Sequence, residues 1–148
     1  MSFFDFFRFS NHQKLSAQEE AEAKESLNKA TQTLEIDVAI MAHDNWKVRL
    51  EAYLSGKSSE DLRPEVIACD ENCDLGKWIY GDGHKHLAKY AAFADLKATH
   101  KMFHYTASSL VTLSQAGKQE EAQQILDSDF STLSTKIRRR LSDLKGLS

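Results

Sequence analysis

The sequence has few of the residues that interrupt helices and none of the patterns that build sheets. One proline, Pro64, and six glycines occur among 148 residues. No stretch alternates β-branched or aromatic residues with polar ones over the length of a strand, as a half-buried strand would. Apolar residues make up 41% and charged residues 28% of the chain, which is the usage of an ordinary globular domain. We therefore predict an all-α protein.

Long apolar runs and cysteines are scarce too. No run approaches the ~20 residues that a membrane-spanning helix needs. The opening stretch MSFFDFFRFSNHQK is interrupted by Asp5 and Arg8, and no cleavage-site pattern follows it, so we do not expect a signal peptide. The only cysteines, Cys69 and Cys73, are too few and too close together for a disulfide framework. These absences predict a cytoplasmic protein in a reducing compartment.

An excess of positive charge is also lacking. The formal net charge is -3 and the isoelectric point is near 6.1, so there is no broad basic surface for a phosphate backbone and we expect no nucleic-acid partner. Lys136 and the run 138–140 form the one basic cluster. Ile137 and Leu141 interrupt and follow this cluster, which is typical of the solvent face of an amphipathic helix.

Apolar residues at helical spacing predict four helical segments. A long first helix is expected over about 16–54, a short one over PEVIACD from Pro64, another from residue 88 or 91 to 116 with Gly117 as its cap, and a last one over about 119–145. Because the connections are short, we predict an antiparallel helical bundle of the four-helix type over 16–148. Residues 1–15 are an aromatic-rich segment before it.

The first helix is uneven in its apolar content. Its N-terminal half has mostly alanines, with Leu27 and Leu34, which is too little apolar area for deep burial in a bundle. That half has three interpretations: it projects from the bundle, it pairs with a second copy, or it is simply solvated. We expect a homodimer on this basis.

Three histidines and one cysteine form a candidate metal site. His100 and His104 are one turn apart in THKMFH, on a helix face that continues through apolar residues. His43 lies on the apolar stripe of the first helix, and Cys73 begins a glycine-containing segment. Taken alone, His43 is more typical of a hydrogen-bonded core residue. Taken alone, the pair His100 and His104 is more typical of two surface histidines. Together the four residues make a nitrogen and sulfur set suited to tetrahedral Zn²⁺.

The same residues resemble a known family. His43 followed by Trp46, then CDLGKW over 73–78, then His100 with His104, is similar to the signature of the chemoreceptor zinc-binding (CZB) domain, a bacterial sensory module. The resemblance covers roughly residues 36–114 and implies an α-helical bundle. It also implies one zinc ion held by three histidines and one cysteine, here His43, Cys73, His100 and His104.

The segment that follows Cys73 explains why a thiol lies there. A sulfur is more easily brought to a point fixed by two helices from a short irregular segment than from another long helix. Leu75 and Trp78 are expected to anchor this segment, and Gly76 to allow a close approach of backbone to helix. Cys69 falls outside the motif and is interpreted as a small buried or part-exposed thiol, in preference to a ligand or a resolving cysteine.

Other polar residues near the motif have weaker claims. His84 and His86, in a predicted loop GDGHKH, and His12 are interpreted as solvent-exposed. Acidic residues surround Cys73 and are either partners for a ligand imidazole or solvated turn residues, namely Asp70, Glu71 and Asp74.

An enzyme is not expected. Four protein ligands close a tetrahedral zinc site, whereas hydrolytic zinc keeps one position for water. Lys101 also stands where the HExxH metalloprotease motif needs its glutamate. No oxyanion-hole motif accompanies Cys73, and no inward Glu-x-x-His pair accompanies the histidines.

Two hypotheses of function remain. The first is a sensory regulator of zinc or oxidant, such as hypochlorite, because the resembled domains regulate chemoreceptors and diguanylate cyclases. The sequence contains neither a methyl-accepting coiled coil nor a GGDEF-type motif, so such a module would signal to a partner protein in trans. The second hypothesis is a structural-interaction protein with a permanent zinc.

The aromatic FFDFFRF start is a candidate for docking to a partner or a membrane interface, and packing against the bundle is favoured over membrane contact.

Overall fold

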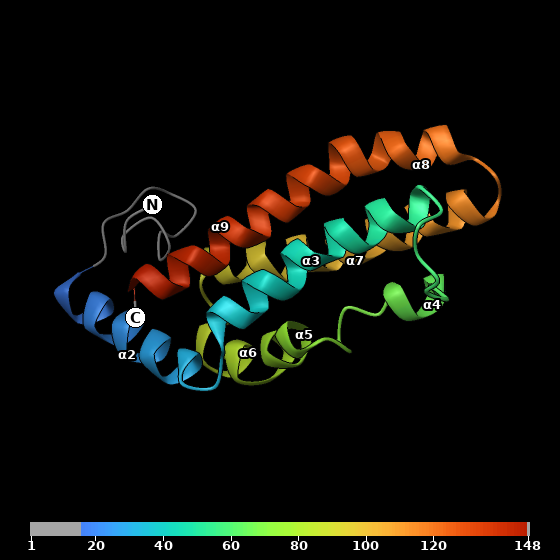
Figure 1. Ribbon diagram of the computed structural model, residues 1–148. Coiled ribbons are helices and arrows are strands. Elements are labelled where there is room, and N and C mark those ends of the chain that lie inside the picture. The colour runs from blue at the N-terminus through green and yellow to red at the C-terminus, as the bar shows by residue number, and fades with distance from the viewer. Residues whose placement is uncertain (1–15, 148) are drawn as a thin grey trace.

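All the regular secondary structure in the described part of the chain is helical. The computed structural model describes residues 16–147, which form helices and no strand, so the predicted all-α class is confirmed (Figure 1). The predictions for FFDFFRF and His12 lie outside the described residues. The elements are α2 (Ala17–Thr31), α3 (Ile36–Leu54), α4 (Pro64–Ile67), α5 (Asp74–Trp78), η1 (Ile79–Gly83), α6 (His84–Leu87), α7 (Ala91–Gln115), α8 (Gln119–Ile125), η2 (Leu126–Phe130) and α9 (Ser131–Leu147).

Three long helical segments, namely α3, α7 and α8 to α9, and a series of short helices make the bundle. α3 and α7 run in the same direction, and α8 continues through η2 into α9 to run back along both (Figure 1). The short helices α4, α5 and α6 lead from the end of α3 back to the start of α7. Among the described helices, none is both long and apolar enough to cross a membrane.

The predicted first helix over 16–54 is wrong in its continuity, because α2 and α3 are separate helices. Tertiary hydrogen bonds hold the break. The Trp78 Nε1–H donates to the carbonyl of Ala30 at 2.8 Å, and the Thr33 hydroxyl donates to Asp82 Oδ2 at 2.6 Å. These bonds satisfy a carbonyl of the last turn of α2 and a side chain just beyond it, so the chain bends without glycine or proline.

The interpretation of α2 as a projecting or solvated helix is also wrong. Ala23, Leu27 and Ala30 are completely buried, and α2 packs on α6. Small residues let the two helices approach closely, so a modest apolar area is enough to fix α2 in place. The capping box of Ser16 and Glu19 begins this helix.

The two C-terminal rods follow the predicted pattern closely. Gly117 has φ of 80°, the left-handed conformation expected after a helix end. α8, η2 and α9 together cover the predicted last helix, with a π-helical turn that brings Phe130 into the core against Phe103, at 4.7 Å between ring centroids. The basic cluster lies on the solvent-facing side of α9, as predicted, and Lys136 and Arg140 form ion pairs with Asp95 there.

The cysteine-containing segment is more helical than predicted. Residues 74–87, including the predicted loop GDGHKH, form α5, η1 and α6, with a kink at Gly81. The buried side chains of Leu75, Ile79 and Leu87 tie these short turns to the bundle. Packing therefore stabilises helical turns that are too short to form alone.

Candidate metal centre

α7 supplies two imidazoles to the centre of the bundle. Its buried residues recur every three or four positions, and His100 and His104 belong to that stripe with 0% and 3% of their surface exposed. A buried imidazole needs a partner for each ring nitrogen. The Nδ1 of His104 lies 2.8 Å from the carbonyl of Ile67. Since a carbonyl only accepts, Nδ1 donates and the lone pair of His104 is on Nε2.

α3 supplies the third imidazole from the opposite side. His43 is 3% exposed, and its Nδ1 lies 2.7 Å from the carbonyl of Ala39, one turn earlier on the same helix. By the same reasoning Nδ1 donates, and the lone pair of His43 is on Nε2. That Nε2 is buried and has no hydrogen-bond partner. A lone pair left without a donor in the core is a cost that a bound cation would remove.

Cys73 supplies a sulfur from the N-cap of α5. Its Sγ accepts a hydrogen bond from the backbone N–H of Gly76 at 3.3 Å. The expected close approach at Gly76 is present: a Cβ built there would lie 1.7 Å from the carbonyl oxygen of Asp70. No side chain fits in that space, so only glycine lets the turn before Cys73 fold against α5.

The expected anchors of this segment are buried. Leu75 is 1% and Trp78 is 5% exposed. The Trp78 indole also makes its hydrogen bond to α2, and its ring meets Phe93 edge-on with 6.0 Å between centroids. The position of the sulfur is thus fixed through packing on both α2 and α7.

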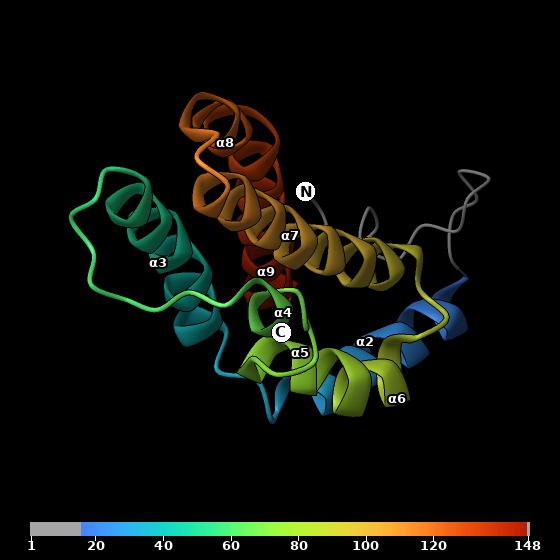
Figure 2. The same ribbon diagram turned by 90° about the vertical axis from the view of Figure 1, so that its right-hand side faces the viewer.

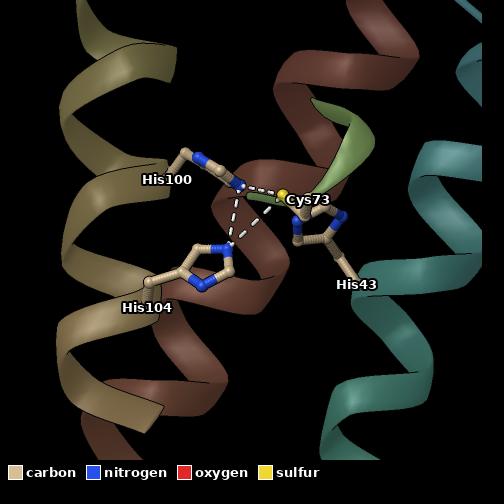
Figure 3. Close-up of side chains that lie close together, drawn as sticks. All are labelled: His43, Cys73, His100 and His104. Carbon is tan, nitrogen blue, oxygen red and sulfur yellow. Dashed lines mark hydrogen bonds between the residues drawn. The ribbon is translucent and has the colours of Figure 1, made fainter. Parts of the chain in front are cut away.

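The four side chains converge on one point (Figure 3). The ligand atoms of His43, Cys73, His100 and His104 all lie within 4.8 Å of one another. Nε2 of His100 is 3.1 Å from Nε2 of His104, and the Cys73 sulfur is 3.3 Å and 3.6 Å from those two nitrogens. The edges of a tetrahedron around Zn²⁺ are about 3.3 Å between nitrogens and about 3.6 Å between nitrogen and sulfur. The residues therefore fit this ion.

Burial keeps the imidazoles neutral. It lowers the pKa of His43, His100 and His104, and for His100 the neighbouring His104 and His43 add to the effect and bring the pKa to about 2. Burial raises the pKa of the Cys73 thiol, against the backbone hydrogen bonds of Gly76 and Leu75. Neutral imidazoles present lone pairs to a cation, whereas the thiol must lose its proton to bind one.

Solvent reaches the centre beside the sulfur. Cys73 is partly exposed and lines two clefts. One cleft, of about 550 Å³, is bordered by Trp46, Cys69 and His104, and the other, of about 780 Å³, by residues that include His43. An ion or small reagent can approach the sulfur from either side of the segment.

The remaining candidates stay outside this group. His84 is exposed, His86 is half-buried, and neither joins the cluster; Cys69 is a part-exposed free thiol on the rim of a cleft. Asp70 is buried at 6% exposure and accepts a hydrogen bond from the Tyr80 hydroxyl at 2.7 Å. This pair could not be predicted, because its residues are ten positions apart on a segment with no regular period.

Comparison with known proteins gives one result. Residues 43–111 match the family model of the chemoreceptor zinc-binding domain. The match begins at the first histidine of the cluster and contains the other three members. No curated protein and no solved structure matches the chain.

Proposed function

Residues 43–111 of this chain are a chemoreceptor zinc-binding domain, and we propose that the chain is a sensory regulator whose zinc is held by His43, Cys73, His100 and His104. The ion would be sensed through its own availability or through oxidation of the thiolate. The change would be passed to a partner protein, such as a chemoreceptor or a diguanylate cyclase.

The observation that carries this proposal is the unequal burial of the four residues. The three histidines are at most 3% exposed and lie on long helices, whereas Cys73 borders two clefts and is the N-cap of a five-residue helix. Bound Zn²⁺ would hold Cys73 as a thiolate and fix its segment to the bundle. An oxidant such as hypochlorite would take two electrons from that sulfur to give a sulfenic acid and chloride, and the oxidised sulfur would be a poorer ligand.

A hydrogen bond links the segment that carries the sulfur to α2. α5 follows its N-cap residue, Cys73, and ends at Trp78, whose indole N–H donates a hydrogen bond to the carbonyl of Ala30 in the last turn of α2. A shift of α5 would therefore strain or break the bond to Ala30. We propose that α2 and the surface around it report the state of the metal centre to the partner.

A catalytic role is not proposed. The family is one of zinc-binding sensory domains. Four protein ligands would also leave no position for an activated water, which hydrolytic zinc requires.

The test is a metal titration of the full chain with two variants. Cobalt, followed by visible absorption, is expected to give the intense bands of a tetrahedral site and a thiolate charge-transfer band in the wild type. Cys73→Ser is expected to lose the charge-transfer band, and His84→Ala, an exposed control, to keep it. Bands that persist unchanged in Cys73→Ser would overturn the ligand assignment.

Sensing is tested separately from binding. Hydrogen exchange of residues 74–87 and of α2 is measured with zinc, with chelator and after hypochlorite. Local acceleration in both segments, with α7 still protected, supports sensing. Unfolding of the whole bundle on metal loss would instead show a permanent structural zinc, the other hypothesis that the sequence left open.

A further inference from the structure

Both cysteines of the chain lie on one short connection. Residues 68–73 join α4 to α5 and lie in front of the long helices in Figure 2. Cys69 and Cys73 are free, partly exposed thiols, and both border the cleft of about 550 Å³ that Trp46 and His104 also border. Cys69 is not a member of the four-residue cluster. The metal centre therefore uses one thiol and leaves a second thiol on the same cleft.

The connection folds back on itself between the two cysteines. The Asn72 N–H donates a hydrogen bond to the carbonyl of Cys69 at 3.5 Å, so residues 69–72 form a closed turn. Such a turn holds its first and last Cα atoms less than about 7 Å apart. The Cys73 sulfur turns back over it and lies 3.9 Å from the carbonyl oxygen of Asp70, the neighbour of Cys69. A disulfide joins Cα atoms about 4.4–6.8 Å apart, and the exposed tip of the turn can adjust to that distance without disturbing the core.

We infer that Cys69 is the resolving thiol of the metal centre: once Cys73 is oxidised, Cys69 attacks its sulfur and the two residues form a disulfide. This inference rests on the proposed function, which supplies the oxidant. From the sequence alone a resolving role was the less favoured interpretation. The shared cleft and the closed turn favour it, because they hold the second thiol close to the sulfur that is oxidised.

The chemistry balances in two steps. In the first, hypochlorous acid transfers its hydroxyl to the Cys73 thiolate: an S–O bond forms, the O–Cl bond breaks, and chloride leaves with the electron pair. The sulfur is oxidised by two electrons and the chlorine is reduced. In the second, the Cys69 sulfur attacks the sulfenic sulfur: an S–S bond forms, the S–O bond breaks, and the thiol proton leaves with the hydroxyl as water. No further oxidant is needed.

The disulfide and a bound zinc ion exclude each other. A Cys73 sulfur that is bonded to Cys69 is no longer a thiolate, so the metal centre keeps only its three histidines. The disulfide also protects Cys73 from a second oxidation to sulfinic acid, which thiols do not reverse. A dithiol reduces the disulfide by exchange and restores the ligand. The function of Cys69 is thus to make the response to oxidant reversible.

The test is hypochlorite treatment of the zinc-loaded full chain, followed by mass spectrometry of tryptic peptides. Trypsin leaves both cysteines on one peptide, because no lysine or arginine lies between them. In the wild type this peptide is expected to become about 2 Da lighter through the loss of two hydrogens, and to return to its reduced mass with a dithiol. In Cys69→Ser, labelling of Cys73 by dimedone, which reacts with sulfenic acids, is expected to be at least about 10-fold higher than in the wild type.

Val66→Ser is the matched control, because Val66 borders the same cleft, is 51% exposed and carries no thiol. Zinc binding is measured with a chromophoric chelator before oxidation, after an excess of hypochlorite, and after reduction. All three proteins are expected to bind zinc equally at first and to release it on oxidation. After reduction the wild type and Val66→Ser are expected to bind zinc again, and Cys69→Ser to bind about 10-fold less. Cys69→Ala is treated in the same way, so that the result does not depend on how serine is accommodated.

A second oxidant tests the geometry alone. Diamide takes two hydrogens from a pair of thiols without forming a sulfenic acid, and in the zinc-free chain it is expected to give the same disulfide. No disulfide with diamide would overturn the inference. So would zinc release by hypochlorite with a dimedone-labelled Cys73 and no disulfide, or a disulfide that joins two chains; both results leave the proposed function intact. Zinc that stays bound under hypochlorite would instead refute the proposed sensing of oxidant, and this inference with it.

Discussion

Gly76→Ala is the sharpest single test of how the chain positions its sulfur ligand. The added methyl would lie 1.7 Å from the carbonyl oxygen of Asp70. An ordinary contact between carbon and oxygen is about 3.3 Å, so the two backbone segments must separate by about 1.6 Å. The obstacle is backbone, which cannot rotate away as a flexible side chain could.

This separation would displace the segment that carries Cys73, whose sulfur accepts a hydrogen bond from the Gly76 N–H. Metal ligands tolerate deviations of only about 0.2 Å, so we expect the zinc affinity to fall by about 100-fold or more, beyond the effect of losing a supporting hydrogen bond. Forcing an extra carbon into a packed region costs about 3 kcal/mol. For a chain of this size that lowers Tm by roughly 10 °C.

Gly81→Ala is the matched control, because a Cβ at Gly81 meets nothing within 4 Å and lies only five residues further along the chain. Zinc affinity is measured by competition with a chromophoric chelator, and stability by thermal unfolding with and without metal. If Gly76→Ala binds zinc and unfolds as Gly81→Ala does, the role assigned to this glycine is wrong.

Three further predictions concern a buried hydrogen bond, an ion pair between helices and the bound metal. Tyr80→Phe removes the donor to the buried Asp70 carboxylate, and we expect a loss of about 1–3 kcal/mol in urea unfolding; an unchanged midpoint would refute this. Partial burial raises the pKa of Asp95, but the hydrogen bonds from Lys136 and Arg140 outweigh burial and the pKa is lowered overall. The stability that Asp95 contributes relative to Asp95→Asn is therefore expected to be full above the ordinary pKa of 3.8 and to disappear as the pH falls through the lowered pKa. Urea unfolding of both proteins from about pH 2 to about pH 7 measures the difference in stability, and a difference that does not change with pH would contradict the prediction. Chelation of the metal is expected to remove about 4 kcal/mol of stability relative to a 1,000-fold excess of zinc over its dissociation constant; calorimetry that shows the same Tm in both states would count against a site in the core.

Some parts of this structure could be predicted from the sequence and others could not. The periodic pattern of α7 predicted its bounds and placed His100 and His104 on one buried face, because a regular helix repeats its environment every turn. The break after Thr31 was missed, since it is held by a hydrogen bond that Trp78 donates to Ala30 and one that Asp82 accepts from Thr33, and each joins residues nearly fifty positions apart.

The metal centre shows the same division. Residue type and the family signature indicated all four members of the cluster. The lone pair directions of His43 and His104 could not be predicted, because they depend on the carbonyls of Ala39 and Ile67, and a backbone carbonyl leaves no mark in a sequence.

The hydrogen bond between Trp78 and Ala30 bears on where the folding unit begins. The family match starts at residue 43, but the indole N–H of Trp78 would lose its acceptor in a fragment cut there, and the surface of α6 that α2 covers would be opened to water. A fragment for crystallisation or for fusion to another domain is therefore expected to need α2 from Ser16 onward. Its boundary is set by a backbone carbonyl of α2, and not by the first ligand histidine.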